Sequence, residues 1–299
     1  MPETPAAPQH HDRFPYSAIV DRPKLHWPNG ARVAVWVSPN IEHFLFDRPS
    51  SSINPFTANL VPDVLNYSWR DYGVRVGIWR LMEVMEQHGI RGTVPLNSDV
   101  VRHYSRIIEA GQALGWEWMG HGITNSTLIN SQPEDEEREI VRAVVDTIGQ
   151  ATGRRPRGWL SPALTESRNT LDLLAETGID YVANWVNDEQ PYPMRVRSGS
   201  MLSLPYSIEI NDFNAFLFQG QSGAQFADTI REQFDVLYED GARTGRVMGI
   251  ALHPFLIGHP HRARHFSRAL AHIASHPDVW LATGSEIADW YRETRATAA

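Results

Sequence analysis

The chain has 299 residues, which is long for one compact domain, although α/β barrels reach this length as a single unit. Its net charge of −8 argues against nucleic acid and anionic membranes as partners. It has no cysteine, which excludes disulfides and thiolate metal sites, so a metal ion could be held only by His, Asp, Glu or amide oxygen.

The first residues of the chain are polar and rich in proline. Residues 1–12 contain no basic region and no apolar run, so they are not typical of a signal peptide. No stretch approaches the roughly 20 apolar residues of a membrane span. We therefore expect a cytoplasmic protein, with a loosely ordered segment over residues 1–25 and a single domain over residues 26–299.

Strand-like and helix-like segments alternate along the chain. The first strand is expected at residues 33–37, and a long loop follows at residues 45–72. A loop of this length in a compact domain is usually functional. Next come a helix over residues 76–87, a strand over residues 92–96 and a helix over residues 100–114.

The alternation continues in the second half of the chain. Ser131, Pro133 and the acidic residues up to Glu137 are typical of a helix start. Further strands are expected at residues 156–160, 181–183, 201–204, 247–252 and 279–281, and helices at 169–177, 226–237, 262–274 and 284–291. About six to eight βα units predict an α/β protein with a parallel sheet or barrel. The sequence has no glycine-rich phosphate loop after a strand, which weighs against a nucleotide cofactor.

Two histidines follow apolar strands and are candidates for the active site. His121 and His253 each come just after such a strand, and α/β proteins build active sites at the carboxyl ends of parallel strands. A neutral His253 could act as a general acid near pH 7. A core histidine bonded to backbone is the alternative for His253, and a loop-capping histidine is the alternative for His121.

Amide and carboxylate side chains accompany these histidines. Asn125 comes four residues after His121, so one helical turn would bring both to the same face, but an amide is a poor zinc ligand. Asn40 and Glu42 follow the first strand and point the same way if that segment is extended. Glu42 is then a candidate metal ligand or general base and Asn40 an orienting group, unless Glu42 is a solvated surface carboxylate.

Other polar segments could line a substrate pocket or be solvated turns. They are residues 187–190, after a strand, and the segment from Glu209 to Asp212, which includes Asn211. Each is weaker evidence than the three groups at strand ends.

Four motifs in order resemble those of a known family. They are Asn40-Ile41-Glu42, the segment from His121 to Asn125, the segment from Gly158 to Pro162, and Leu252-His253-Pro254. Together they resemble the polysaccharide deacetylase superfamily (carbohydrate esterase family 4-like), and most closely its allantoinase-like and peptidoglycan-deacetylase-like branch. The resemblance implies a single-domain α/β fold, a distorted (β/α) barrel of about seven or eight strands. It also implies hydrolysis of carbon–nitrogen bonds other than peptide bonds.

The resemblance assigns roles to particular residues. Glu42, His121 and Asn125 match the positions that hold a divalent metal, with zinc the expected ion, while Asn40 matches the catalytic Asp and His253 the general acid. Glu42, His253 and Asn40 are therefore the expected catalytic residues. The residues expected to bind substrate are Trp159, Glu209, Asn211 and Asp212.

Two positions depart from the pattern of the metal-dependent members. An amide at Asn40 cannot take a proton from water, and an amide at Asn125 weakens a zinc site. Both departures are typical of the allantoinase-like branch, some of whose members work without metal. The resemblance thus implies hydrolysis of a small linear or cyclic amide, ureide-like or imide-like, in a homodimer or homotetramer. A metal-dependent deacetylase of N-acetylated sugars and an inactive ligand-binding barrel are the alternatives.

Overall fold

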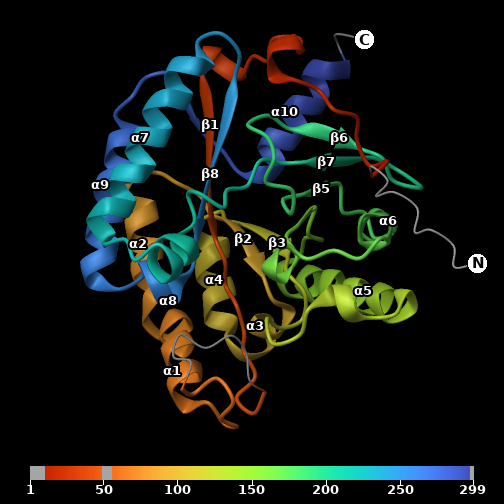
Figure 1. Cartoon of the computed structure of the whole chain (residues 1–299), viewed down its shortest axis with the longest axis vertical. Coiled ribbons are helices and arrows are strands. Elements are labelled where there is room, and N and C mark those ends of the chain that lie inside the picture. Colours follow the sequence, from red (N-terminus) through yellow and green to blue (C-terminus); the bar gives the residue numbers. More distant parts are fainter. Residues whose placement is uncertain (1–10, 49–55, 297–299) are drawn as a thin grey trace, which may run out of the picture.

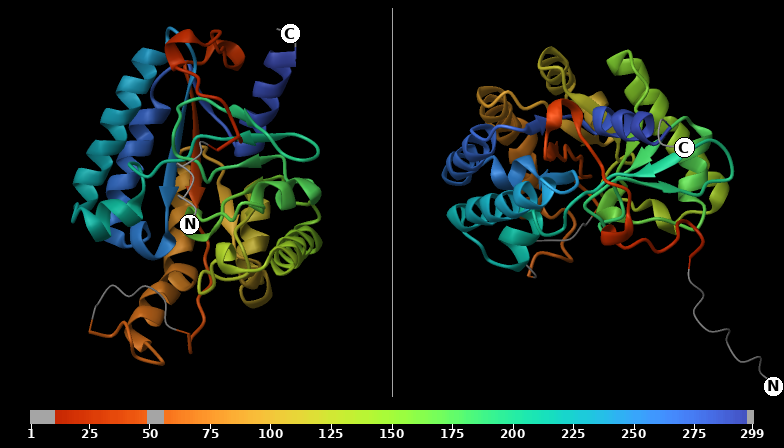
Figure 2. Two further views of the ribbon diagram at one scale, coloured as in Figure 1. Left: turned by 45° about the vertical axis from the view of Figure 1, so that its right-hand side comes forward. Right: turned by 90° about the horizontal axis from the view of Figure 1, so that it is seen from above.

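A layer of mostly parallel strands forms the centre of the molecule, and helices surround it (Figures 1 and 2). The computed structural model describes residues 11–48 and 56–296. The strands are β1 (Val33–Pro39), β2 (Thr93–Leu96), β3 (Glu117–Gly120), β4 (Gly158–Trp159), β5 (Tyr181–Val182), β6 (Tyr192–Met194), β7 (Met201–Ser203), β8 (Arg246–Leu252) and β9 (Val279–Leu281).

The helices lie on the outside of these strands. They are α1 (Val64–Tyr72), α2 (Ile78–Gln87), α3 (Ser98–His103), α4 (Ser105–Ala113), α5 (Glu134–Thr152), α6 (Thr170–Glu176), α7 (Gly223–Gly241), α8 (Pro254–Ile257), α9 (Pro260–Ala274) and α10 (Gly284–Ala296). Helices α7 and α9 pack side by side next to β8, and α1 projects from the end of the molecule at which β1 and β8 terminate (Figure 1).

The strands trace a distorted barrel, as the sequence predicts. One sheet has the order β8-β1-β9 and the other the order β2-β3-β4-β5-β7-β6, with β6 the antiparallel strand. Isolated parallel bridges connect β1 to β2 at Val37–Gly92 and Ile41–Leu96, and Asn211 bridges to Ala251 of β8. The barrel therefore has two seams that are held by isolated bridges, two at the first seam and one at the second, instead of continuous ladders.

Strands β1 and β8 form the most deeply buried part of the barrel. Every residue of both strands is buried, as expected for parallel strands covered on both faces. Trp36 of β1 is fully buried and donates a hydrogen bond from Nε1 to the carbonyl of Pro205 at 2.9 Å. This packing fixes the strand ends that carry Glu42 and His253.

The first helices differ most from the sequence prediction. Part of the loop expected over residues 45–72 is helix α1, while residues 49–55 of that loop lie outside the described residues. Asp63 caps α1 by accepting a hydrogen bond from the Asn66 backbone at 3.1 Å. The buried side chains of α1 are polar, Asn66 and Arg70, so this helix has no apolar stripe that the sequence could reveal. A π-helical turn at Gly73–Gly77 joins α1 to α2.

Three smaller differences concern helix ends and one strand. The helix expected over residues 100–114 is divided into α3 and α4 at Tyr104, whose φ and ψ are −137° and 50°. Helix α5 begins at Glu134, after a 3₁₀ turn at Ile129–Ser131, and its N-cap position is Pro133. Strand β6 was not expected from the sequence, and Pro193 at its centre is consistent with its place at the edge of the sheet.

Residues 11–25 differ from the loosely ordered segment expected from the sequence. Arg13 forms an ion pair with Asp172 at 3.0 Å, and Arg22 forms one with Asp188 at 2.7 Å. Phe14 also packs edge-on against Trp185, with ring centroids 5.4 Å apart. This part of the chain is therefore bound to the domain, while residues 1–10 lie outside the described residues.

The lengths and hydropathies of the helices bear on whether the chain could span a membrane. Within residues 11–48 and 56–296, none of them is both long enough and apolar enough to cross a bilayer.

Candidate active site

A cavity of about 550 Å³ opens at the carboxyl ends of the strands. Side chains that follow three strands line it: Asn40 and Glu42 after β1, His121 and Asn125 after β3, and His253 after β8. The structure thus brings together the five residues that the sequence selected at strand ends. The segment from His121 to Asn125 is a loop and not the helical turn considered from the sequence, yet both side chains reach the cavity.

His253 is held between two carboxylates. Its Nδ1 lies 2.7 Å from Oδ1 of Asp212, and its backbone N–H donates to Oδ2 of Asp212 at 2.9 Å. Asp212 is fully buried and also accepts a hydrogen bond from the backbone of Ile257 at 3.2 Å. Because Nδ1–H is used by Asp212, Nε2 is the atom of His253 that faces Glu42, 3.7 Å from Oε1.

Glu42 and His253 each stabilise the charged form of the other. Burial alone would lower the pKa of His253, but the charges of Glu42 and Asp212 outweigh it and raise the pKa above its ordinary value. Burial alone would raise the pKa of Glu42, but the charge of His253 is the main cause that lowers it below its ordinary value. Glu42 is therefore the carboxylate and His253 the imidazolium of a buried pair.

His121 presents a lone pair to the same carboxylate. Its Nδ1 lies 2.5 Å from the carbonyl of Leu160, and a carbonyl only accepts, so Nδ1 carries the hydrogen. The neutral ring then has its lone pair on Nε2, which lies 3.5 Å from Oε1 of Glu42. Among the described residues, Nε2 has no hydrogen-bond partner. In this tautomer His121 can accept a hydrogen bond from water but cannot donate one to an oxyanion.

Asn97, which lies behind the cavity wall, sets the orientation of Asn125. Oδ1 of Asn97 accepts a hydrogen bond from the backbone of His43 at 2.8 Å, so its Nδ2 is the donor to the carbonyl of His121 and to Oδ1 of Asn125. The second of these bonds is 3.0 Å long. Asn125 must therefore turn its own Nδ2 toward Glu42, where it donates to Oε1 at 2.5 Å.

These orientations decide whether the expected zinc site fits. A catalytic zinc ion usually has three protein ligands, each offering a lone pair. Here Glu42 and His121 offer lone pairs, but Asn125 offers N–H groups. The residues therefore do not form a zinc site of that kind, and the predicted ligand Asn125 is instead a hydrogen-bond donor to Glu42.

Asn40 connects the ends of two strands to the cavity wall. Its Nδ2 donates to the carbonyl of Leu252 and to Oη of Tyr206, both at 3.0 Å. Both hydrogens are thus used, and an amide cannot take a proton, so Asn40 orients its neighbours. Burial raises the pKa of Tyr206, so its hydroxyl keeps a hydrogen that it can donate.

The residues expected to bind substrate occupy four different environments. Asn211 lines the active-site cavity, whereas Asp212 lies behind His253. Trp159 is fully buried in the core and donates from Nε1 to Ser161 at 2.9 Å. Glu209 lines a separate cavity of about 590 Å³. Of these four residues, Asn211 alone lies in the wall of the active-site cavity.

Burial of Trp159 depends on a glycine at the end of β3. A Cβ added to Gly120 would lie 2.3 Å from the Trp159 ring, well inside van der Waals contact. Gly120 immediately precedes His121, so this close approach also fixes where His121 enters the site.

Arg70 is a cavity residue that the sequence analysis missed. It projects from α1, with its guanidinium 3.9 Å from the centre of the Phe44 ring. Burial lowers the pKa of Arg70 to about 10, with the charge of Glu42 opposing the shift, so the side chain remains a cation at neutral pH. Arg70 lies in the segment expected to be a loop, and its sequence neighbours give no sign of its burial.

Comparison with known proteins agrees with this geometry. The family model for polysaccharide deacetylase matches residues 67–182. A Schizosaccharomyces pombe protein, provisionally named as a polysaccharide deacetylase, is 28% identical over 88% of this chain and 91% of its own. A Helicobacter pylori peptidoglycan deacetylase is 24% identical over 72% of this chain and 83% of its own. The crystal structure of the allantoinase PuuE is 26% identical, covers 92% of this chain and 95% of its own, and has a TM-score of 0.84.

The barrel and its strand-end site define the class of protein. It is a hydrolase of carbon–nitrogen bonds other than peptide bonds. Residues 67–182 match the polysaccharide deacetylase family, and the solved structures that the whole chain resembles include a probable polysaccharide deacetylase from Pseudomonas aeruginosa and the allantoinase. Deacetylases that match this family model are generally metal-dependent, and the N–H that Asn125 directs at Glu42 does not fit such a metal site.

Proposed function

We propose that the protein hydrolyses a carbon–nitrogen bond of a small linear or cyclic amide, ureide-like or imide-like. The observation that carries this proposal is the fixed amide of Asn125, which turns an N–H toward Glu42 where a metal ligand is expected. The size of the cavity, about 550 Å³, suits a small molecule. The structural similarity to an allantoinase supports the same substrate class.

The chemistry follows from the charges of the two buried groups. Glu42 accepts a proton from water while the water oxygen bonds to the carbonyl carbon, and the lone pair of His121 helps to hold that water. His253 then gives its Nε2 proton to the nitrogen as the carbon–nitrogen bond breaks. The products are a carboxylic acid and an amine. Transfer of the proton from Glu42 to His253, across the 3.7 Å between them, restores the starting state.

Arg70 gives the cavity a preference for oxygen-rich substrates. A guanidinium in the cavity wall can donate hydrogen bonds to the carbonyl groups of ureides and imides in the plane that it favours. Tyr206 also lines the cavity and can donate a hydrogen bond to a second oxygen of the substrate.

We expect Arg70→Met to lower kcat/KM about 10- to 100-fold, because a hydrogen bond to a charged group contributes roughly 1.5–3 kcal/mol. Most of the loss should appear as a higher KM, with a partial recovery in Arg70→Lys. Steady-state kinetics on the best substrate would measure both variants. An unchanged KM in Arg70→Met would show that Arg70 does not bind substrate.

A panel of substrates tests the proposal itself. Purified protein would be incubated with cyclic ureides, imides, linear ureides and N-acetylated chito-oligosaccharides, before and after dialysis against a chelator. We expect turnover of a ureide or imide, at a rate that chelation leaves unchanged. Chelator-sensitive release of acetate from the oligosaccharides, with ureides and imides untouched, would contradict the proposal.

Deacetylation of an N-acetylated sugar is the second candidate, and the named activities of the two curated relatives favour it. In that reaction the same pair, Glu42 and His253, would act on an acetamide. The panel separates the two candidates by the product formed. Binding of a compound without turnover of any would instead identify an inactive ligand-binding barrel.

A further inference from the structure

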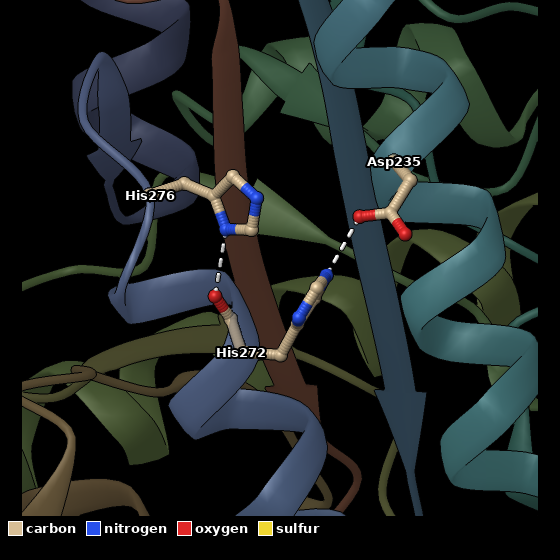
Figure 3. Close-up of side chains that lie close together, drawn as sticks. All are labelled: Asp235, His272 and His276. Carbon is tan, nitrogen blue, oxygen red and sulfur yellow. Dashed lines mark hydrogen bonds and ion pairs between the residues drawn. The ribbon is translucent and has the colours of Figure 1, made fainter.

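A second cluster of ligating side chains lies on the outer helical layer, between α7 and α9. It consists of Asp235 on α7, His272 in the last turn of α9, and His276 four residues later (Figure 3). One ligand atom from each residue lies within 4.8 Å of the others. Helix α9 starts soon after the carboxyl end of β8 and ends shortly before β9, which pairs with the first residues of β1. The cluster is therefore at the opposite end of the strands from the active site.

The hydrogen bonds of His276 prepare it to bind a cation. Its Nδ1 lies 2.8 Å from the backbone carbonyl of His272, which can only accept, so Nδ1 carries the hydrogen. The lone pair of the neutral ring is then on Nε2, which points toward the other two side chains (Figure 3). Metal-binding histidines commonly donate their second N–H to a carbonyl in this way, which fixes the tautomer.

His272 and Asp235 already face each other. Nε2 of His272 lies 2.6 Å from Oδ1 of Asp235, so the two atoms share a hydrogen. The same two atoms could instead bind one ion. The side chains of Asp235 and His272 are 48% and 31% exposed, which leaves room for water as a further ligand.

Aromatic side chains hold the two imidazoles in place. The ring of Phe234 lies 5.8 Å from that of His272 and 5.0 Å from that of His276, and Tyr238 lies 5.2 Å from His276. The two imidazoles are themselves 4.7 Å apart. The rings are therefore already ordered in the folded protein, so binding of an ion costs little further side-chain conformational entropy.

We propose that Asp235, His272 and His276 bind one divalent transition-metal cation, with Zn²⁺ the best match to two imidazoles and one carboxylate. The ion takes the place of the hydrogen between His272 and Asp235, and in the neutral imidazole this hydrogen moves to Nδ1, which leaves the lone pair of Nε2 for the ion. Because the ligands come from α7 and from the end of α9, the ion clamps these helices together. The site is structural and is independent of the amide-hydrolase chemistry at the other end of the barrel.

Zinc titration by calorimetry, on the full chain freed of metal by dialysis, tests this proposal. We expect His276→Gln to lose one equivalent of Zn²⁺, or to bind it at least tenfold more weakly than the unsubstituted protein, and Asp235→Asn to behave alike. His261→Gln, on the exposed surface of the same helix, is the matched control and should bind like the unsubstituted protein. The Glu42→Gln variant should keep this equivalent, which separates it from any ion at the active site.

Thermal unfolding gives a second readout. Zn²⁺ at about a hundredfold excess over its dissociation constant should raise the unfolding midpoint by roughly 5 °C, and Mg²⁺ should not. His276→Gln should lose this shift and His261→Gln should keep it. Equal zinc binding and equal shifts in His276→Gln and the unsubstituted protein would overturn the proposal. Absence of zinc binding by the unsubstituted protein would also overturn it, and would leave the cluster as a hydrogen-bonded contact between helices.

Discussion

Replacing Glu42 with Gln should lower kcat/KM by about 10³-fold, within the range of roughly 10²–10⁴ that general acid–base catalysis supplies. The amide has nearly the same shape as the carboxylate, but it cannot take a proton from water and carries no charge to hold His253 protonated. The measurement is steady-state kinetics together with a urea unfolding curve. The fold should persist, because His253 keeps its bonds to Asp212.

Glu209→Gln is the matched control for this experiment. Glu209, like Glu42, lies in a loop outside the strands, but it lines the separate cavity. We therefore expect the Glu209→Gln variant to be as active as the unsubstituted protein. Full activity in Glu42→Gln would remove Glu42 from the mechanism. Loss of activity with loss of cooperative unfolding would instead point to a structural role.

Replacing Asp212 with Asn should lower kcat about 10²- to 10⁴-fold and also change the pH profile. Oδ2 of Asp212 accepts two backbone N–H groups, so an asparagine would keep its oxygen there and turn its NH₂ toward Nδ1 of His253. The hydrogen of the neutral imidazole would then move from Nδ1 to Nε2. Glu42 would still raise the pKa of His253, but the contribution of the Asp212 charge and hydrogen bond would be lost.

The sign of the pH effect follows from these shifts. His253 must be protonated to act as the acid, so activity falls as pH rises through its raised pKa. Glu42 must be ionised, so activity falls as pH drops through its lowered pKa. In Asp212→Asn the pKa of His253 decreases, and the alkaline limb of the kcat/KM profile should move to lower pH.

His253→Gln serves as the comparison for Asp212→Asn. If both residues act as one unit, the double variant should be about as slow as His253→Gln alone. An alkaline limb that stays in place in Asp212→Asn would contradict the role of Asp212. Multiplicative losses in the double variant would show that the two residues act separately.

The alternation of elements predicted a parallel sheet or barrel with a site at the strand ends, and the family resemblance implied the barrel. Strands such as β1 and β8 are nearly continuous apolar runs, and the side chains that follow them must meet at one edge when the strands are parallel. This argument brought Glu42, His121 and His253 together correctly. The argument needs only the observation that polar residues directly follow apolar strands along the chain, which can be read from the sequence.

The remaining features depend on contacts between distant parts of the chain. Helix α1 buries Arg70 against the ring of Phe44, and a sequence does not show which side chain of a polar helix is buried. Asp212 was expected to contact substrate, but its 41-residue separation from His253 conceals the bond between them. The orientation of the Asn125 amide depends on Asn97. The sequence of the motif is the same for both orientations, so it cannot distinguish them.

Asn97 is itself outside the cavity wall, yet it decides which atom of Asn125 faces Glu42. Two relatives could therefore have the same residues in their cavity walls and still differ in the orientation of the Asn125 amide. In one, the amide would offer a lone pair to an incoming molecule, and in the other it would offer an N–H. A comparison of such relatives that aligns only the residues lining their cavities would group them together. The residue that distinguishes them stands one layer deeper, where it is anchored by the backbone of His43.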